Sequence, residues 1–383
     1  MKRLAVLAVC LFLCLVFGGR ALAAESWEEG DYEWEEEFGS YDFGAVEQIL
    51  NEVLGRDRIS FGEVAGRLAK GDFTGFWELF VKYARDAVLG EMEDGLSVAW
   101  QVLLIAVLGA FFTNLSRAFP DGQMAETGFY VMYMTLAVLL FAAFHSAMSV
   151  AGKAFLVTGR LMSAFLPVFF LAVAVQGQLT AASMYEGTVL MIGGMQWVYE
   201  HVVLTGIKGC VALKILEGVM PEDFLTRLQG LIRRGVIWIM KAGSGAVIGL
   251  QVVQGLLLPY LDAAGGGVFL KLAGAIPGVG NSVEAAAKMA LGTAALIRNS
   301  IGLAGLLALL LVCLGPLVKL GFLTLLYQGL AAFLQPVSDK RLLAAVDAVG
   351  DGSRLLFKAL WTAMLLFAIA IGVACACLGR GSV

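Results

Sequence analysis

Charged and catalytic side chains are scarce in this sequence. Only 15% of its 383 residues are charged and only two are histidine, whereas a soluble domain carries about 25% charged residues. Neither His145 nor His201 has a His-x-x-x-His or Glu-x-x-His arrangement, and no G-x-S-x-G or GxxxxGK[ST] motif occurs. These absences exclude the common metalloprotease, serine hydrolase and nucleotide-binding sites, so we expect no enzyme activity, cofactor or metal ion.

Cysteine is rare as well, and no cysteines and histidines have the spacing of a zinc finger. We expect the six cysteines to pack as small apolar side chains, without a disulfide framework. A basic patch interleaved with aromatic residues is also absent, so a nucleic-acid partner is not expected.

Apolar residues dominate what is present. They make up 59% of the chain, and the mean hydropathy is +0.82. The 47 glycines recur inside the apolar runs, where small residues let membrane helices approach closely. This composition predicts an all-α, polytopic membrane helix bundle whose main solvent is the lipid bilayer.

The first 23 residues have the pattern of a signal peptide. Lys2 and Arg3 precede an apolar run, Leu4–Val16, and Ala21-Leu22-Ala23 forms an A-x-A cleavage site. This run is shorter than the roughly 20 residues that a spanning helix needs. An uncleaved first membrane helix is the alternative, and both interpretations place the residues after Ala24 outside the cytoplasm.

Residues 24–95 form an acidic segment. Between Ala24 and Gly95, 19 side chains are acidic and six are basic, whereas 18 basic and 12 acidic side chains follow. Residues 25–43 cannot bury enough apolar surface to order themselves, but helical spacing of apolar residues follows in 45–54, 61–68 and 73–88. We expect a small exported helical domain whose negative charge either binds a basic partner or faces solvent.

Residues 96–378 contain the predicted transmembrane region, with six to eight spans and seven as the best single value, before a tail at 379–383. The basic run from Arg227 to Lys241 lies between two of these spans, and the positive-inside rule places it in the cytoplasm. The expected spans are Ser97–Leu115, Phe129–Val150, Phe155–Val175, Ala181–Val219 as either one re-entrant segment or two crossings, Ala246–Leu261, Ile301–Leu334 with a bend at Pro316, and Leu355–Leu378.

Several charged residues lie within or close to these apolar runs. A charge at the centre of a bilayer costs at least about 2.5–3.5 kcal/mol, so it normally faces a cavity, a partner or the interface. Arg160 and Glu186 are the best candidates for an ion pair. The alternatives for the whole set are snorkelling or structural pairing on one side and a hydrated path or subunit interface on the other. The set is Arg160, Glu186, Lys271, Lys319 and Lys358.

Residues 265–300 are too interrupted for a simple span. Pro277, Gly278 and Gly280 force a turn between two apolar stretches. We expect a broken helical hairpin. It is either re-entrant within the membrane, where transporters place their sites, or interfacial and outside the bilayer.

A second break follows at residues 335–352. A span ends at its proline, Ser338 is expected to cap the next short helix, and two basic residues anchor that helix at the lipid headgroups. Val349–Gly352 is predicted to form a turn before the last span. The candidate structural residues of this break are Pro336, Asp339, Lys340 and Arg341.

The runs GAIPGVGNSVEAAAKMALGTAALIRNSIGLAG (274–305) and LQPVSDKRLLAAVDAVGD (334–351) resemble the stage III sporulation protein AE family of endospore-forming bacteria. The resemblance implies a subunit of a multi-protein complex in the mother-cell membrane that surrounds the forespore. It further implies a separate ATPase, a forespore-side partner and a channel or secretion-like role that supports forespore development. The family has no established catalytic residues, so none is expected in this chain.

Two functional hypotheses follow. A non-enzymatic subunit of a channel or export apparatus predicts membrane spans, glycine-rich packing, an exported segment and no nucleotide motif. A permease-like transporter subunit for a small solute predicts a broken helix with charges near the middle of the membrane, which residues 265–300 fit in part.

Overall fold

Long helices account for nearly all of the chain that the computed structural model describes. None of these described residues lies in a β-strand, so the predicted all-α class is confirmed for them. The described residues are 41–54, 60–69, 80–87, 89–90, 96, 100–105, 107–108, 111, 122–174, 181–218, 225–274, 280–336 and 339–378.

The helices differ greatly in length, from two short ones near the N-terminus to several that exceed 35 residues. A π-helical turn, η1, joins α7 directly to α8. The bounds are α3 Gly44–Leu54, α4 Phe61–Ala69, α6 Gly122–Ala174, α7 Ala181–Trp197, η1 Val198–Val203, α8 Leu204–Glu217, α9 Thr226–Gly274, α10 Gly280–Leu334 and α11 Lys340–Leu378.

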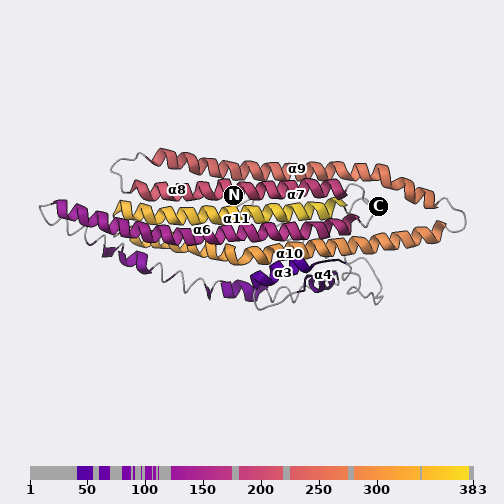
Figure 1. Cartoon of the computed structure of the whole chain (residues 1–383), viewed down its shortest axis with the longest axis horizontal. Helices are drawn as coiled ribbons and strands as arrows, with labels where there is room; N and C mark the ends of the chain where they lie inside the picture. Colours follow the sequence, from indigo (N-terminus) through magenta and orange to yellow (C-terminus); the bar gives the residue numbers. More distant parts are fainter. Residues whose placement is uncertain are drawn as a thin grey trace.

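The long helices lie side by side along a common axis, and α11 occupies the middle of the bundle (Figure 1). Helix α11 packs against α10, α6, α9 and α8. One set of its buried residues recurs every seven positions along most of its length, because this period keeps one face of a helix turned toward its neighbours. These residues are Leu342, Val349, Leu356, Ala363 and Ala370.

The turn predicted at Val349–Gly352 is wrong, because α11 continues through it without a break. The two glycines have a packing role instead. A β-carbon on Gly350 would lie 3.3 Å from Cβ of Tyr327, and one on Gly352 would overlap Val211. Both glycines thus let α11 approach its neighbours closely.

Four helices are long and apolar enough to cross a membrane within the described part of the chain. The predicted count of six to eight spans is therefore not confirmed, and the span predicted at Ser97–Leu115 falls partly on residues that are not described. The predicted spans Phe129–Val150 and Phe155–Val175 lie in one uninterrupted helix, α6. The candidate spans are Thr127–Ala174, Thr226–Gln254, Ile297–Leu334 and Lys340–Cys375.

The longest helices exceed the thickness of a bilayer. Helix α6 has 53 residues and α10 has 55, so each is about 80 Å long at 1.5 Å per residue. The hydrocarbon core of a membrane is about 30 Å thick. Parts of these helices must therefore lie beyond it, and Figure 1 shows α9 and α10 extending together past the ends of α6, α7 and α11.

The region predicted at 181–219 forms a continuous rod from α7 through η1 to α8. Its last part packs against α9 and α11 through buried side chains such as Val203, Ile207 and Val211. The rod contains no turn at which it could reverse direction. Within the described residues, this argues against two separate crossings here.

The basic run from Arg227 to Lys241, predicted between spans, lies in the first part of helix α9. The same helix contains the candidate span Thr226–Gln254, so no loop separates the run from the apolar residues that follow it. The position of the run outside the membrane stays a prediction. The hydropathy of these residues is lowered by their charges, but one helical face remains apolar and buries Val236 and Met240. That face is enough to continue the helix.

Helices α3 and α4, both predicted from their spacing, pack on the side of the bundle against α6 and α10. The ring of Phe61 lies 5.0 Å from that of Phe43 and 6.2 Å from that of Phe165 in α6. Glu47 of α3 accepts a 2.6 Å hydrogen bond from the backbone N–H of Phe61 and a 2.9 Å bond from Ser60. Half of the predicted third stretch, 73–88, falls outside the described residues, and the described half, 80–87, is helical.

Candidate functional site

Arg160 and Glu186, the predicted ion pair, are both exposed and do not meet. The helices that carry them are neighbours, but their register keeps the two side chains apart. Gly159 of α6 lies against Gln196, and Phe170 lies 5.7 Å from Tyr185. Glu186 thus stands near the level of Phe170, about ten residues along α6 from Arg160.

The predicted hairpin at 265–300 lies at the projecting tip of α9 and α10. Helix α9 ends at Gly274 and α10 begins at Gly280. Pro277 and Gly278 fall outside the described residues, and nothing is described of the Lys271 side chain. Whether this hairpin is re-entrant or interfacial stays a prediction.

Pro316 and Lys319 both lie inside helix α10, which continues past the proline. Each is half-buried, beside the buried residues Leu317 and Leu320. The bend predicted at Pro316 therefore does not interrupt the helix.

The predicted break at 335–341 is confirmed as the boundary between α10 and α11. Pro336 is exposed in a turn, and the Oδ1 atom of Asp339 accepts a 2.9 Å hydrogen bond from the backbone N–H of Arg341. Asp339 therefore caps α11, whereas the predicted cap, Ser338, is outside the described residues. Lys340 and Arg341 are exposed, and the Arg341 guanidinium lies 5.8 Å from the centre of the Phe129 ring.

The strongest electrostatic contact between distant parts of the chain joins α8, α9 and α11. The Oδ2 atom of Asp351 lies 3.3 Å from Nζ of Lys214 and 3.9 Å from Nη2 of Arg233. The side chains of Asp351 and Lys214 are only 34% and 24% exposed. We call these three residues the charged junction. One carboxylate thus holds together three helices.

Positive charge exceeds negative charge around this junction. Arg354 and Lys358 follow Asp351 by three and seven residues, so they share its face of α11.

Nearby, the Tyr133 hydroxyl of α6 donates a 2.6 Å hydrogen bond to the carbonyl oxygen of Ile215. The end of α8 is therefore fixed to both α11 and α6, which positions the turn toward α9.

Sequence reasoning missed the charged junction. The i, i+3, i+7 spacing of Asp351, Arg354 and Lys358 was the available signal for a charged helix face, but Val349–Gly352 was interpreted as a turn. Arg298 was also missed. It is almost fully buried in α10, with its Nη2 atom 3.2 Å from Oδ1 of Asn299.

Replacing Asp351 with asparagine is expected to lower the free energy of unfolding by about 1–3 kcal/mol. Lys214 and Arg233 would lose their shared anion. The expected loss of unfolding free energy lies between the contribution of an exposed ion pair and the cost of leaving a buried charge unpaired. Thermal unfolding of the purified chain in detergent measures the change.

The matched control for this substitution is Asp347→Asn on the same helix. Asp347 is exposed and has no ion pair among the described residues. It should change stability by less than about 0.5 kcal/mol. Equal effects of the two substitutions would contradict a role for the junction in holding the helices together.

The described residues offer no group of three or more His, Cys, Asp or Glu side chains that could hold a metal ion. Cys313 is fully buried, with its sulfur 3.5 Å from the hydroxyl oxygen of Thr158. This contact joins α10 to α6 and is one of helix packing.

Comparison with known proteins identifies the family of this chain. The sequence profile of the stage III sporulation protein AE family matches residues 59–377. The chain belongs to that family. The match extends from α4 to the last turn of α11, so it includes all four candidate spans and the charged junction.

A curated relative in the family is the stage III sporulation protein AE of Bacillus subtilis (strain 168). It is 22% identical over 278 residues, which cover 71% of this chain and 69% of that protein. No solved structure matches the chain. The predicted family is confirmed, and the apolar helices indicate a membrane protein in a sporulation context.

Proposed function

We propose that this chain is a non-enzymatic, integral membrane subunit of a channel or secretion-like complex that connects the mother cell to the forespore. The observation that carries the proposal is the family match over residues 59–377, which coincides with four apolar helices long enough to cross a membrane. A chain built this way has lipid-embedded helices to contribute to a pore or scaffold, and its sequence contains no nucleotide-binding motif.

In the proposed topology, the signal peptide is removed, residues 24–95 lie outside the cytoplasm, and the helices cross the mother-cell membrane around the forespore. The exposed ion pair of Glu63 and Arg67, with 2.6 Å between Oε1 and Nη2, supports an aqueous location for the outer face of α4. The basic first half of α9 supports a cytoplasmic location for its start.

The proposed partners are other subunits of the stage III complex, including a separate ATPase and a forespore-side protein. Support comes from large apolar side chains that remain exposed on α6 and α10, such as Val138 at 70% and Phe333 at 77%. In a membrane protein these faces contact either lipid or the helices of other subunits.

A permease-like subunit that moves a small solute is the second candidate. The observation that favours it is a polar stretch inside the bundle, since neither polar side-chain atom of the buried Gln251 has a hydrogen-bond partner among the described residues. One turn further along α9, Gln254 lies against Gly187 of α7. Buried amides of this kind line hydrated paths as well as helix contacts.

Removing the gene from its native sporulating host is expected to arrest forespore development after engulfment, and re-expression of the intact chain should restore spores. A tagged chain should localise to the membrane around the forespore and co-purify with an ATPase. Normal spore numbers without the gene would contradict the proposal.

Reconstitution of the purified chain alone into vesicles separates the two candidates. A channel-complex subunit should show no solute flux without its partners, because its pore requires other subunits. Flux that depends on Gln251, measured with the Gln251→Leu variant, would instead establish the permease.

A further inference from the structure

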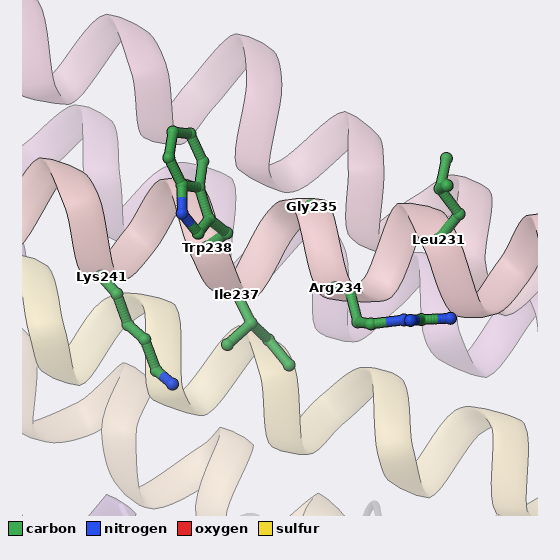
Figure 2. Close-up of a pocket in the computed structure, with 6 residues that line it drawn as sticks. All are labelled: Leu231, Arg234, Gly235, Ile237, Trp238 and Lys241. Atoms are coloured by element: carbon green, nitrogen blue, oxygen red, sulfur yellow. The ribbon is translucent and has the colours of Figure 1, made fainter.

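Helix α9 carries an open groove on its outer face with a volume of about 590 Å³. Its lining residues combine large apolar side chains with two cations. Trp238 is 70% exposed and Leu231 is 66% exposed. Figure 2 shows the lining residues, Leu231, Arg234, Gly235, Ile237, Trp238 and Lys241.

The two cations of this groove have no counter-charge within the described part of the chain. Arg234 donates only a 3.2 Å hydrogen bond from Nε to the carbonyl oxygen of Gly230 in its own helix. Lys241 makes no ion pair there. The adjacent Arg233 differs, because it turns toward Asp351 in the charged junction. The outer face of α9 therefore presents positive charge that the protein itself leaves uncompensated.

The same face becomes purely apolar further along the helix. Exposed positions continue the stripe at Gly245, Ile248 and Val252, each three or four residues after the last. A β-carbon on Gly245 would meet no atom within 4 Å, so the surface of α9 is open at this position. Cations thus occupy one part of a single stripe and apolar residues the other.

The apolar part of this stripe is long enough to reach the middle of a bilayer. From Lys241 to Val252 is 11 residues, or about 17 Å at 1.5 Å per residue, and half of a hydrocarbon core is about 15 Å. Trp238 lies on the cationic side of this boundary, the level at which tryptophan concentrates in membrane proteins.

Helix α9 is also the candidate span that the rest of the chain covers least. Only 22% of its most apolar window is buried, compared with 56–67% in the other three candidate spans. The described residues therefore leave its outer face uncovered along the whole stripe.

We propose that this stripe is a binding site for an anionic phospholipid. Arg234 and Lys241 attract the anionic headgroup from its two sides, the Trp238 ring lies between them, and an acyl chain lies along Gly245, Ile248 and Val252. Basic grooves on the cytoplasmic side of membrane helices recognise such headgroups. This inference goes beyond the proposed function and does not depend on it.

Native mass spectrometry of the full-length chain in detergent tests the proposal. Dioleoylphosphatidylglycerol and dioleoylphosphatidylcholine are titrated separately. The wild-type chain should bind the phosphatidylglycerol more tightly. The R234Q/K241Q variant should lose this preference, with affinity reduced roughly 10- to 30-fold, because each cation near an anionic headgroup contributes about tenfold at most.

The matched control is R85Q/K153Q, which also removes one arginine and one lysine. Both residues are exposed, and neither belongs to α9. The control should bind phosphatidylglycerol as the wild type does, and a Trp238→Ala variant should weaken binding without removing the preference for the anionic lipid. Equal binding of the two lipids by the wild type, or equal losses in both double variants, would overturn the proposal. A dimeric wild-type chain would also overturn the proposal if R234Q/K241Q dissociated the dimer without changing lipid binding, because a second copy would then cover the stripe.

Discussion

Replacing Phe61 with alanine is expected to detach α3 and α4 from the bundle, at a cost of about 3–5 kcal/mol. Phe61 is 1% exposed and lies between the rings of Phe43 and Phe165. It is the largest side chain by which α4 contacts α6. Its loss leaves a cavity that two neighbouring rings cannot fill, and the backbone contact with Glu47 does not replace the lost apolar contact.

Hydrogen–deuterium exchange measures this detachment directly. In the Phe61→Ala variant, amides of residues 44–69 should exchange much faster, while those of α11 should keep their protection. The control is Phe333→Ala, which removes a largely exposed phenylalanine from α10. Unchanged protection of residues 44–69 in Phe61→Ala would show that α3 and α4 are held by other contacts.

Replacing Gly352 with valine is expected to destabilise the bundle by about 3 kcal/mol, at the upper end of typical overpacking. A β-carbon at this position would overlap Cγ2 of Val211 and lie 2.7 Å from Cε2 of Phe144. The contact atoms belong to a branched side chain and an aromatic ring, neither of which can move aside easily. Helices α8 and α6 would both be pushed away from α11.

The matched control is Gly209→Val in α8, where a β-carbon would meet no atom within 4 Å. The same change in helix propensity applies at both positions, so the difference between their thermal unfolding midpoints isolates the steric effect. Similar midpoints for the two variants would mean that α11 does not approach its neighbours as closely as described.

The apolar runs of the sequence predicted which residues would be helical, but not where each helix would end. Hydropathy identifies a run of about 20 residues and says little about a polar residue between two runs. Lys153 separates two apolar runs and Arg160 interrupts the second, yet both lie on the exposed face of α6 while its buried face continues. An apolar stripe on one face is sufficient for a helix to continue, so two expected spans became one.

Glycine misled the prediction in α11 for a related reason. In the sequence, Val349–Gly352 has the composition of a turn. In the structure, Gly350 and Gly352 are the positions at which other helices come closest. Whether a glycine marks a turn or a close contact depends on neighbours that are distant in the sequence, here Tyr327 and Val211.

The candidate site was less predictable than the helices. Lys214 and Asp351 are 137 residues apart, and no local pattern connects them. Asp339 was singled out correctly as part of a break, because the capping of a helix depends on residues within one turn. Local chemistry was therefore accessible from the sequence, and contacts across the bundle were not.

The π-helical turn η1 constrains how the length of this chain can vary. A π-turn accommodates an extra residue compared with an α-turn, so one residue could be removed from Val198–Val203 with little rotation of α8. Removing one residue from the regular helix α7 would instead rotate all of α8 by about 100°. Ile207 and Val211 would then leave the core, and Lys214 would turn away from Asp351. Related sequences should therefore conserve the spacing within α7 strictly and tolerate a change of one residue at η1.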